Sequence, residues 1–143
     1  KRVIGLPGDK IKIVNGEIFL NNKVVVRKKM KDFIDNDKNS PTKRARKYKE
    51  YFKDLTFDVL DIMDNGIADN TELFSVPDGY FFVMGDNRDN SQDSRFKTVG
   101  FIPINNLVGK ARFIFFSLEN SRFLEIWKWP KAIRGSRIFT TIK

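Results

Sequence analysis

The stretch YFFVMGDNRDNSQDSR, residues 80–95, decides the fold because it joins a strand signal directly to a long polar loop. Its first half is rich in aromatic and β-branched residues, which predicts a buried β-strand. From Gly85 to Arg95 the chain is almost wholly Asp, Asn, Arg, Ser and Gln. Hairpin loops usually take only about 2–5 residues. We therefore interpret this loop either as a decorated surface loop or as a polar network that holds a functional group in place.

Further strands are predicted upstream. Residues 1–9, KRVIGLPGD, are typical of a short strand that ends in a Pro-Gly turn. Alternating isoleucines then lead to Asn15-Gly16, a strong hairpin signal, because a type I′ turn needs positive φ at both central residues. A second tight turn at Asn21-Asn22 is expected to lead into a third strand.

The remaining segments complete a mostly β pattern. Residues 30–54 are polar and charged and contain a proline, so we interpret them as an insertion, whereas residues 55–64 return to strand-like alternation. After the long loop, residues 103–107 predict a turn or short helix and residues 108–118 another strand. The tail, residues 123–143, has a weak pattern. We expect antiparallel sheets with little helix.

Composition limits the chemistry. The 143 residues include neither Cys nor His, which excludes a Ser-His-Asp triad, a Cys-His dyad and a metal site built on thiolate or imidazole ligands. If the chain takes part in hydrolysis, its general base must be Lys, Asp or Glu. The net charge of +9 favours an anionic partner, either nucleic acid or an acidic lipid surface.

Lys1 is a candidate general base, although a lysine at the end of a strand is more often only a solvated charge. A free lysine titrates near about 10.4 and is mostly protonated at neutral pH. Burial against apolar side chains disfavours the ammonium, so a desolvated lysine can accept a proton. The neighbouring Val3 and Ile4 could supply such apolar walls.

The polar loop contains groups that could hold this lysine, although charge pairs in a surface loop often contribute little. A calcium loop is excluded, because the positions that would need Gly and a bidentate Glu carry Ser and Gly. In the functional interpretation, the Ser91 hydroxyl orients the lysine amine. Asp93 and Arg95 form a charge pair that fixes the loop, and Asp86 holds Arg2.

Together, KRVIGLPGD and GDNRDNSQDSR, followed by GFIP and LVGKA, resemble two signature boxes of bacterial type I signal peptidase (leader peptidase). The tail WPKAIRGSRI is similar to the C-terminal segment of Gram-negative members. The resemblance covers residues 1–29 and 77–138. It implies an antiparallel, signal-peptidase-like β fold, with residues 1–29 and 77–143 as the catalytic core and residues 30–76 as a small inserted subdomain.

The resemblance also implies a serine endopeptidase that cleaves signal peptides from exported preproteins with a Ser-Lys dyad. Lys1 matches the general base, and Ser91 matches the serine that hydrogen-bonds the lysine amine. The supporting charged residues of the family match Arg2, Asp86, Asp93 and Arg95. No residue is assigned to substrate binding, and no metal or cofactor is required.

The implied location is the bacterial inner membrane, with the catalytic domain on its periplasmic face. The implied partners are preprotein signal peptides and the lipid surface, whereas nucleic acid is not expected. Trp127 and Trp129 fit either a hydrophobic core or a contact with lipid, because tryptophan favours the membrane interface.

The sequence departs from the family at the nucleophile. The family's serine box, roughly P-S-x-S-M-x-P-T, is absent, and SPTKR at residues 40–44 shares only a dipeptide and follows the lysine. We therefore expect this chain to be the C-terminal part of a longer protein whose nucleophile and membrane anchors lie upstream. Alone, it should be inactive.

Two other functions stay open. A basic, β-rich nucleic-acid-binding module would explain TKRARKYK, residues 42–49, but not the matched Asp and Arg residues of the long loop. The chain could also be an interaction protein that descends from the peptidase and has lost its activity.

Overall fold

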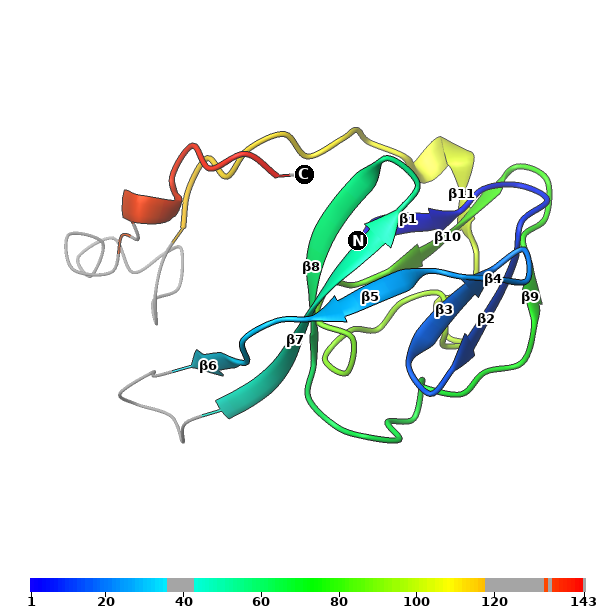
Figure 1. Cartoon of the computed structure of the whole chain (residues 1–143). Coiled ribbons are helices and arrows are strands. Elements are labelled where there is room, and N and C mark those ends of the chain that lie inside the picture. Colours follow the sequence, from blue (N-terminus) through cyan, green and yellow to red (C-terminus); the bar gives the residue numbers. More distant parts are fainter. Residues whose placement is uncertain (36–42, 118–132, 134, 143) are drawn as a thin grey trace. The chain divides into compact units, whose positions relative to one another are not determined.

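The computed structural model describes residues 1–35, 43–117, 133 and 135–142. It divides the chain into two compact units, Lys1–Leu107 and Val108–Lys143. The larger unit contains three antiparallel sheets (Figure 1). The described residues contain no α-helix, only the 3-10 turns η1 (Ile104–Asn106) and η3 (Gly135–Arg137). The prediction of a mostly β, antiparallel protein is therefore confirmed.

The first sheet brings the two ends of the candidate site together. It has the order β1-β10-β11, with bounds Arg2–Gly5, Tyr80–Met84 and Ile102–Pro103. Arg2 lies opposite Met84, and Val3 lies opposite Val83. Because the strands are antiparallel, the start of β1 lies beside the end of β10, as Figure 1 shows near the N-terminus. Lys1 therefore meets the beginning of the polar loop.

The second sheet confirms both tight turns. Its order is β4-β3-β2-β9, with bounds Lys23–Val24, Glu17–Leu20, Lys10–Val14 and Phe74–Ser75. Asn15 and Gly16 have φ values of 49° and 75°, and Asn21 and Asn22 have values of 50° and 64°. Both pairs thus adopt the left-handed conformation that a type I′ turn requires.

The third sheet is built around a long hairpin. Strands β5 (Val26–Lys29), β7 (Lys43–Phe52) and β6 (Phe33–Asp35) lie in the order β5-β7-β6, and β8 (Leu55–Asp61) pairs with β7. Asp61 lies opposite Arg46, and Leu55 lies opposite Phe52. The strand predicted within residues 55–64 is confirmed, and the basic run before it forms the longest strand of the sheet.

Two sequence-based predictions are wrong. The single strand expected after Asn21-Asn22 is divided between two sheets, because Val25 is buried in the core and separates β4 from β5. The strand expected at residues 108–118 does not form in its described part, where pairing is limited to a bridge between Phe113 and Thr141 and to a few backbone hydrogen bonds beside it. A strand needs continuous pairing, which this short contact does not supply.

One hydrophobic core joins the three sheets. On β2, Ile11 and Ile13 alternate with exposed lysines, so their side chains point into the core, as period-2 patterning requires. The same cluster includes Phe82 of β10 and Phe57 of β8. The long hairpin therefore packs with the sheets that contain β2 and β10. The assignment of residues 30–76 to an inserted subdomain stays a prediction.

None of the helical segments that the structure describes is long and apolar enough to cross a lipid bilayer.

Candidate active site

Lys1 and Ser91 meet although ninety positions separate them. The Lys1 Nζ donates a hydrogen bond to Ser91 Oγ at 2.6 Å. Ser91 is buried, with 8% of its surface exposed, whereas Lys1 as a whole residue is exposed. Ile4 belongs to the core cluster. The apolar enclosure that the sequence predicts for the Lys1 amine is thus incomplete in the described chain. The Ser91 hydroxyl is the polar group that holds the amine.

Gly85 makes this approach possible. A Cβ atom at this position would lie 2.2 Å from Ser91 Oγ, 2.6 Å from Ser91 Cβ and 3.4 Å from Lys1 Nζ. The first two distances are far shorter than a normal van der Waals contact. Ser91 therefore occupies space that any side chain at residue 85 would fill.

The predicted pair of Asp93 and Arg95 lies next to Ser91, whose hydroxyl interacts with Asp93. Arg95 Nε and Nη2 donate to the two carboxylate oxygens of Asp93, each at 2.8 Å, and the Gly85 N–H donates to Asp93 Oδ2 at 2.9 Å. Burial tends to raise the pKa of Asp93. The hydrogen bonds from Arg95, Gly85 and Ser91, together with the Arg95 charge, outweigh that effect and lower the pKa below its usual range. Asp93 is therefore an anion that fixes the loop.

Asp86 and Arg2 also pair as the sequence predicts. Arg2 Nε and Nη2 each donate to Asp86 at 3.0 Å, so the contact is bidentate. The Arg2 guanidinium also lies 3.8 Å from the centre of the Phe57 ring. Arg2 thus joins the start of the polar loop to the long hairpin.

Sequence reasoning missed a buried ion pair that also involves the loop. Arg88 donates through Nη1 and Nη2 to the two carboxylate oxygens of Glu50, at 2.8 and 2.5 Å. The pair connects the loop to β7. The available signal was a single acidic residue in the otherwise basic and aromatic run of β7, but no spacing rule connects it to a loop almost forty residues away.

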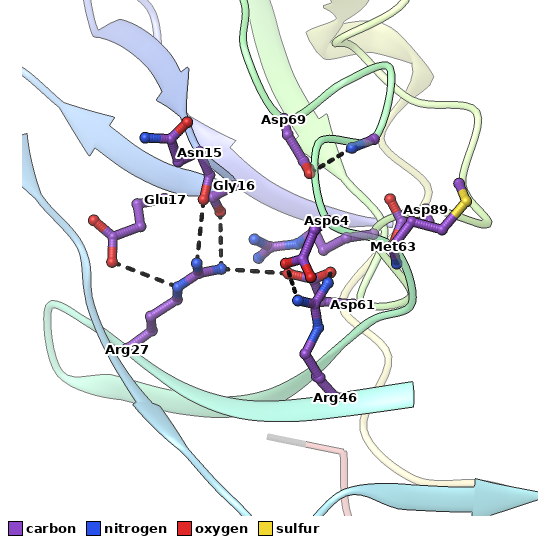
Figure 2. A network of polar contacts seen from close by, with 12 residues as sticks. Asn15, Gly16, Glu17, Arg27, Arg46, Asp61, Met63, Asp64, Asp69 and Asp89 are labelled. Carbon is purple, nitrogen blue, oxygen red and sulfur yellow. Dashed lines mark hydrogen bonds and ion pairs between the residues drawn. The ribbon is translucent and has the colours of Figure 1, made fainter. Parts of the chain in front are cut away.

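A second polar network borders the loop, and Figure 2 shows its arginines among several aspartates. Arg46 Nη2 donates to Asp61 at 2.7 Å, and Arg46 also pairs with Asp64. Burial raises the pKa of Asp61, the Arg46 charge opposes this shift, and the charges of Asp89 and Asp69 add to it. Within the described residues, no group of acidic side chains is arranged to hold a metal ion. The network joins chain segments through ion pairs.

The substrate-binding residues stay unassigned. Two surface hollows, of about 360 and 300 Å³, have linings that include neither Lys1 nor Ser91. Trp127 and Trp129, proposed for lipid contact, lie outside the described residues. The geometry therefore supports an oriented amine on the described surface.

Comparisons with known proteins show which family this chain resembles. A family described as "Signal peptidase, peptidase S26" matches residues 1–116. Signal peptidase I of Rickettsia typhi is 36% identical over 99% of this chain and 58% of the relative. Signal peptidase I of Rickettsia bellii strain OSU 85-389 is 35% identical, and that of Rickettsia prowazekii is 34% identical, over 53% and 58% of their lengths. The chain thus spans little more than half the length of these curated relatives.

Proposed function

The chain belongs to the signal peptidase family, peptidase S26, and on that premise we propose that it carries the general base of a serine endopeptidase. This enzyme would cleave signal peptides from exported preproteins. The observation that carries the proposal is the 2.6 Å hydrogen bond between Lys1 Nζ and Ser91 Oγ. It gives a lysine amine one defined orientation in a chain that has no histidine.

The chemistry follows from the direction of this hydrogen bond. Because Lys1 donates an N–H to Ser91, the lone pair of the neutral amine stays available for a second hydroxyl. That lone pair would take the proton of the nucleophilic serine as its oxygen attacks the scissile carbonyl, and the resulting ammonium would protonate the leaving amine. The amine would then take a proton from water, which attacks the acyl-enzyme.

Ser91 is proposed as the orienting group and not as the nucleophile. It is buried, and its oxygen already accepts from Lys1. The Ser91 hydroxyl also helps to lower the pKa of Asp93, so it faces the carboxylate behind it. A nucleophile needs an accessible oxygen, so we assign that role to a different serine, which by the family resemblance would lie upstream.

The place of action is part of the same proposal. A signal peptide emerges at the membrane, so the enzyme would work at the bacterial inner membrane with this chain on the periplasmic face. The substrate and a lipid surface would be its partners.

The nucleic-acid alternative has less support. Most cations of the basic strand β7 already have acidic neighbours: Arg44 contacts Asp32, Arg46 contacts Asp61, and Lys47 contacts Asp58 at 2.7 Å. Nucleic-acid binding depends on cations that are available to phosphates.

Cleavage of a preprotein by the full-length protein tests the proposal. We expect Lys1→Met to abolish cleavage, whereas Lys12→Met, on the exposed face of β2, should leave it unchanged. Ser91→Ala should slow cleavage but leave residual turnover, because the base remains and loses only its orientation. Wild-type rates in Lys1→Met would remove the lysine from the mechanism. Complete loss in Ser91→Ala, with a mutated upstream serine retaining activity, would make Ser91 the nucleophile.

A further inference from the structure

The buried pair of Arg88 and Glu50 anchors the polar loop to β7. Both side chains are almost fully buried, with 6% and 1% of their surfaces exposed, and the contact is bidentate. Burying two charges is costly, and such a pair is often no more stabilising than apolar residues of similar size. Stability alone therefore does not explain why this pair is present beside the candidate site.

Backbone contacts hold the same part of the loop against β8. The Leu60 N–H donates to the Asp86 carbonyl, and the Arg88 N–H donates to the Leu60 carbonyl, both at 2.8 Å. Farther along the loop, Asp89 Oδ2 accepts from the N–H groups of Ile62 and Met63, at 2.6 and 2.9 Å. The hairpin and the segment after it thus hold the loop at three residues, Asp86, Arg88 and Asp89.

A chain of contacts connects Arg88 to the amine. The Arg88 carbonyl accepts from Arg95 Nη2 at 2.6 Å. Arg95 binds Asp93, and Asp93 accepts from the N–H of Gly85, the residue packed against Ser91. A shift of Arg88 would therefore move the groups that place the Ser91 oxygen.

We infer that Glu50 and Arg88 are positioning residues for the Lys1 amine, acting through the loop that carries Ser91. The inference rests on the proposed function and deepens it. No hydrogen bond or ion pair among the described residues joins either side chain directly to Lys1. Their effect would come from fixing the loop backbone, which must hold Ser91 Oγ within hydrogen-bonding distance of Lys1 Nζ.

Replacing both partners together separates positioning from stability. In the full-length protein, Glu50→Met with Arg88→Met leaves no buried charge unpaired, so we expect the fold to persist. The kcat for preprotein cleavage should fall about 100-fold at unchanged KM, because a misplaced reactive group slows chemistry without weakening substrate binding. The Lys1 side-chain ¹⁵Nζ resonance should also shift as its bond to Ser91 is lost.

A matched control is available on the same hairpin. Lys47→Met with Asp58→Met removes a partly exposed pair of similar length, 2.7 Å, and should change neither kcat nor the Lys1 resonance. Arg88→Lys keeps a buried cation beside Glu50 but loses the bidentate contact, so kcat should fall about tenfold. This milder variant decides the question if the double replacement does not fold.

Wild-type kcat and an unchanged Lys1 resonance in the folded double variant, or in Arg88→Lys, would overturn the inference. Failure of the proposed function looks different. In that case the wild-type protein would not cleave preprotein, or Lys1→Met would cleave it normally. The Lys1 resonance would still report whether Glu50 and Arg88 position the amine.

Discussion

At the scale of single residues, Gly85 shows how a missing side chain determines the geometry of the site. A Cβ atom there would overlap both Oγ and Cβ of Ser91, and the Ser91 Cβ cannot move unless the backbone moves. We expect Gly85→Ala to cost about 1–3 kcal/mol of stability through overpacking. Activity should fall further than stability explains, because Ser91 is displaced from Lys1. Thermal unfolding and cleavage assays measure the two effects.

Gly109→Ala is the control for this substitution, because nothing lies within 4 Å of the added Cβ and its φ is not positive. If Gly85→Ala kept wild-type stability and activity, the close approach of Ser91 to residue 85 would not matter for either property.

Asp93 gives the protein a defined pH dependence. Its pKa is lowered in the fold from the usual 3.8, so the native state binds fewer protons than the unfolded state between the two pKa values. The stability that Asp93 contributes is fully present above about pH 3.8, the usual pKa, and is lost as the pH falls through the pKa of the folded state. Asp93→Asn should cost about 3–5 kcal/mol at neutral pH, because Arg95 stays buried without its charge partner. The difference from wild type should shrink below pH 3.8.

Urea unfolding at several pH values measures this effect, with Asp54→Asn in an exposed turn as the control. A stability difference between wild type and Asp93→Asn that stayed constant down to the acid transition would show that the carboxylate is not held as an anion.

At the scale of elements, the turn between β2 and β3 depends on its glycine. Gly16 has a φ of 75°, and a Cβ there would lie 3.3 Å from Arg27 Nη1. We expect Gly16→Ala to cost about 1–2 kcal/mol, because a residue with a Cβ is strained in the left-handed region. The exposed Lys12→Ala on β2 should cost much less. Equal chemical denaturation midpoints for the two variants would argue against a turn that depends on glycine.

The same elements show what a sequence can predict. Asn15-Gly16 and the alternation of β8 encode local geometry, so the sequence predicts the turn and the strand without knowledge of their tertiary contacts. The residues of the loop from Gly85 to Arg95 were placed by resemblance, and Lys1 does meet Ser91. Glu50 could not be found, because its role depends on a contact with Arg88 far along the chain. The break of a predicted strand at Val25 depends likewise on tertiary burial.

At the scale of the larger unit, residues 1–107, the long hairpin and the sheet beside the candidate site share one core. Phe57 of β8 belongs to the same buried cluster as Ile11 of β2 and Phe82 of β10. Its ring also lies under the Arg2 guanidinium, at the start of β1. The long hairpin therefore supports the sheet whose strands β1 and β10 bring Lys1 and Ser91 together. Such an arrangement should unfold as one cooperative unit.

Phe57→Ala tests this cooperativity. Removing a buried aromatic ring should cost about 3–5 kcal/mol, and the loss should be spread over the unit. Native-state hydrogen exchange should show reduced protection in β2 and β10 as well as in β8, because their amides exchange through a shared unfolding event. Leu55→Ala, on the exposed side of β8, should change protection little. If protection fell only in β7 and β8, the hairpin would be an independent folding unit. Glu50 would then position the loop from a unit that unfolds separately from the rest of the core.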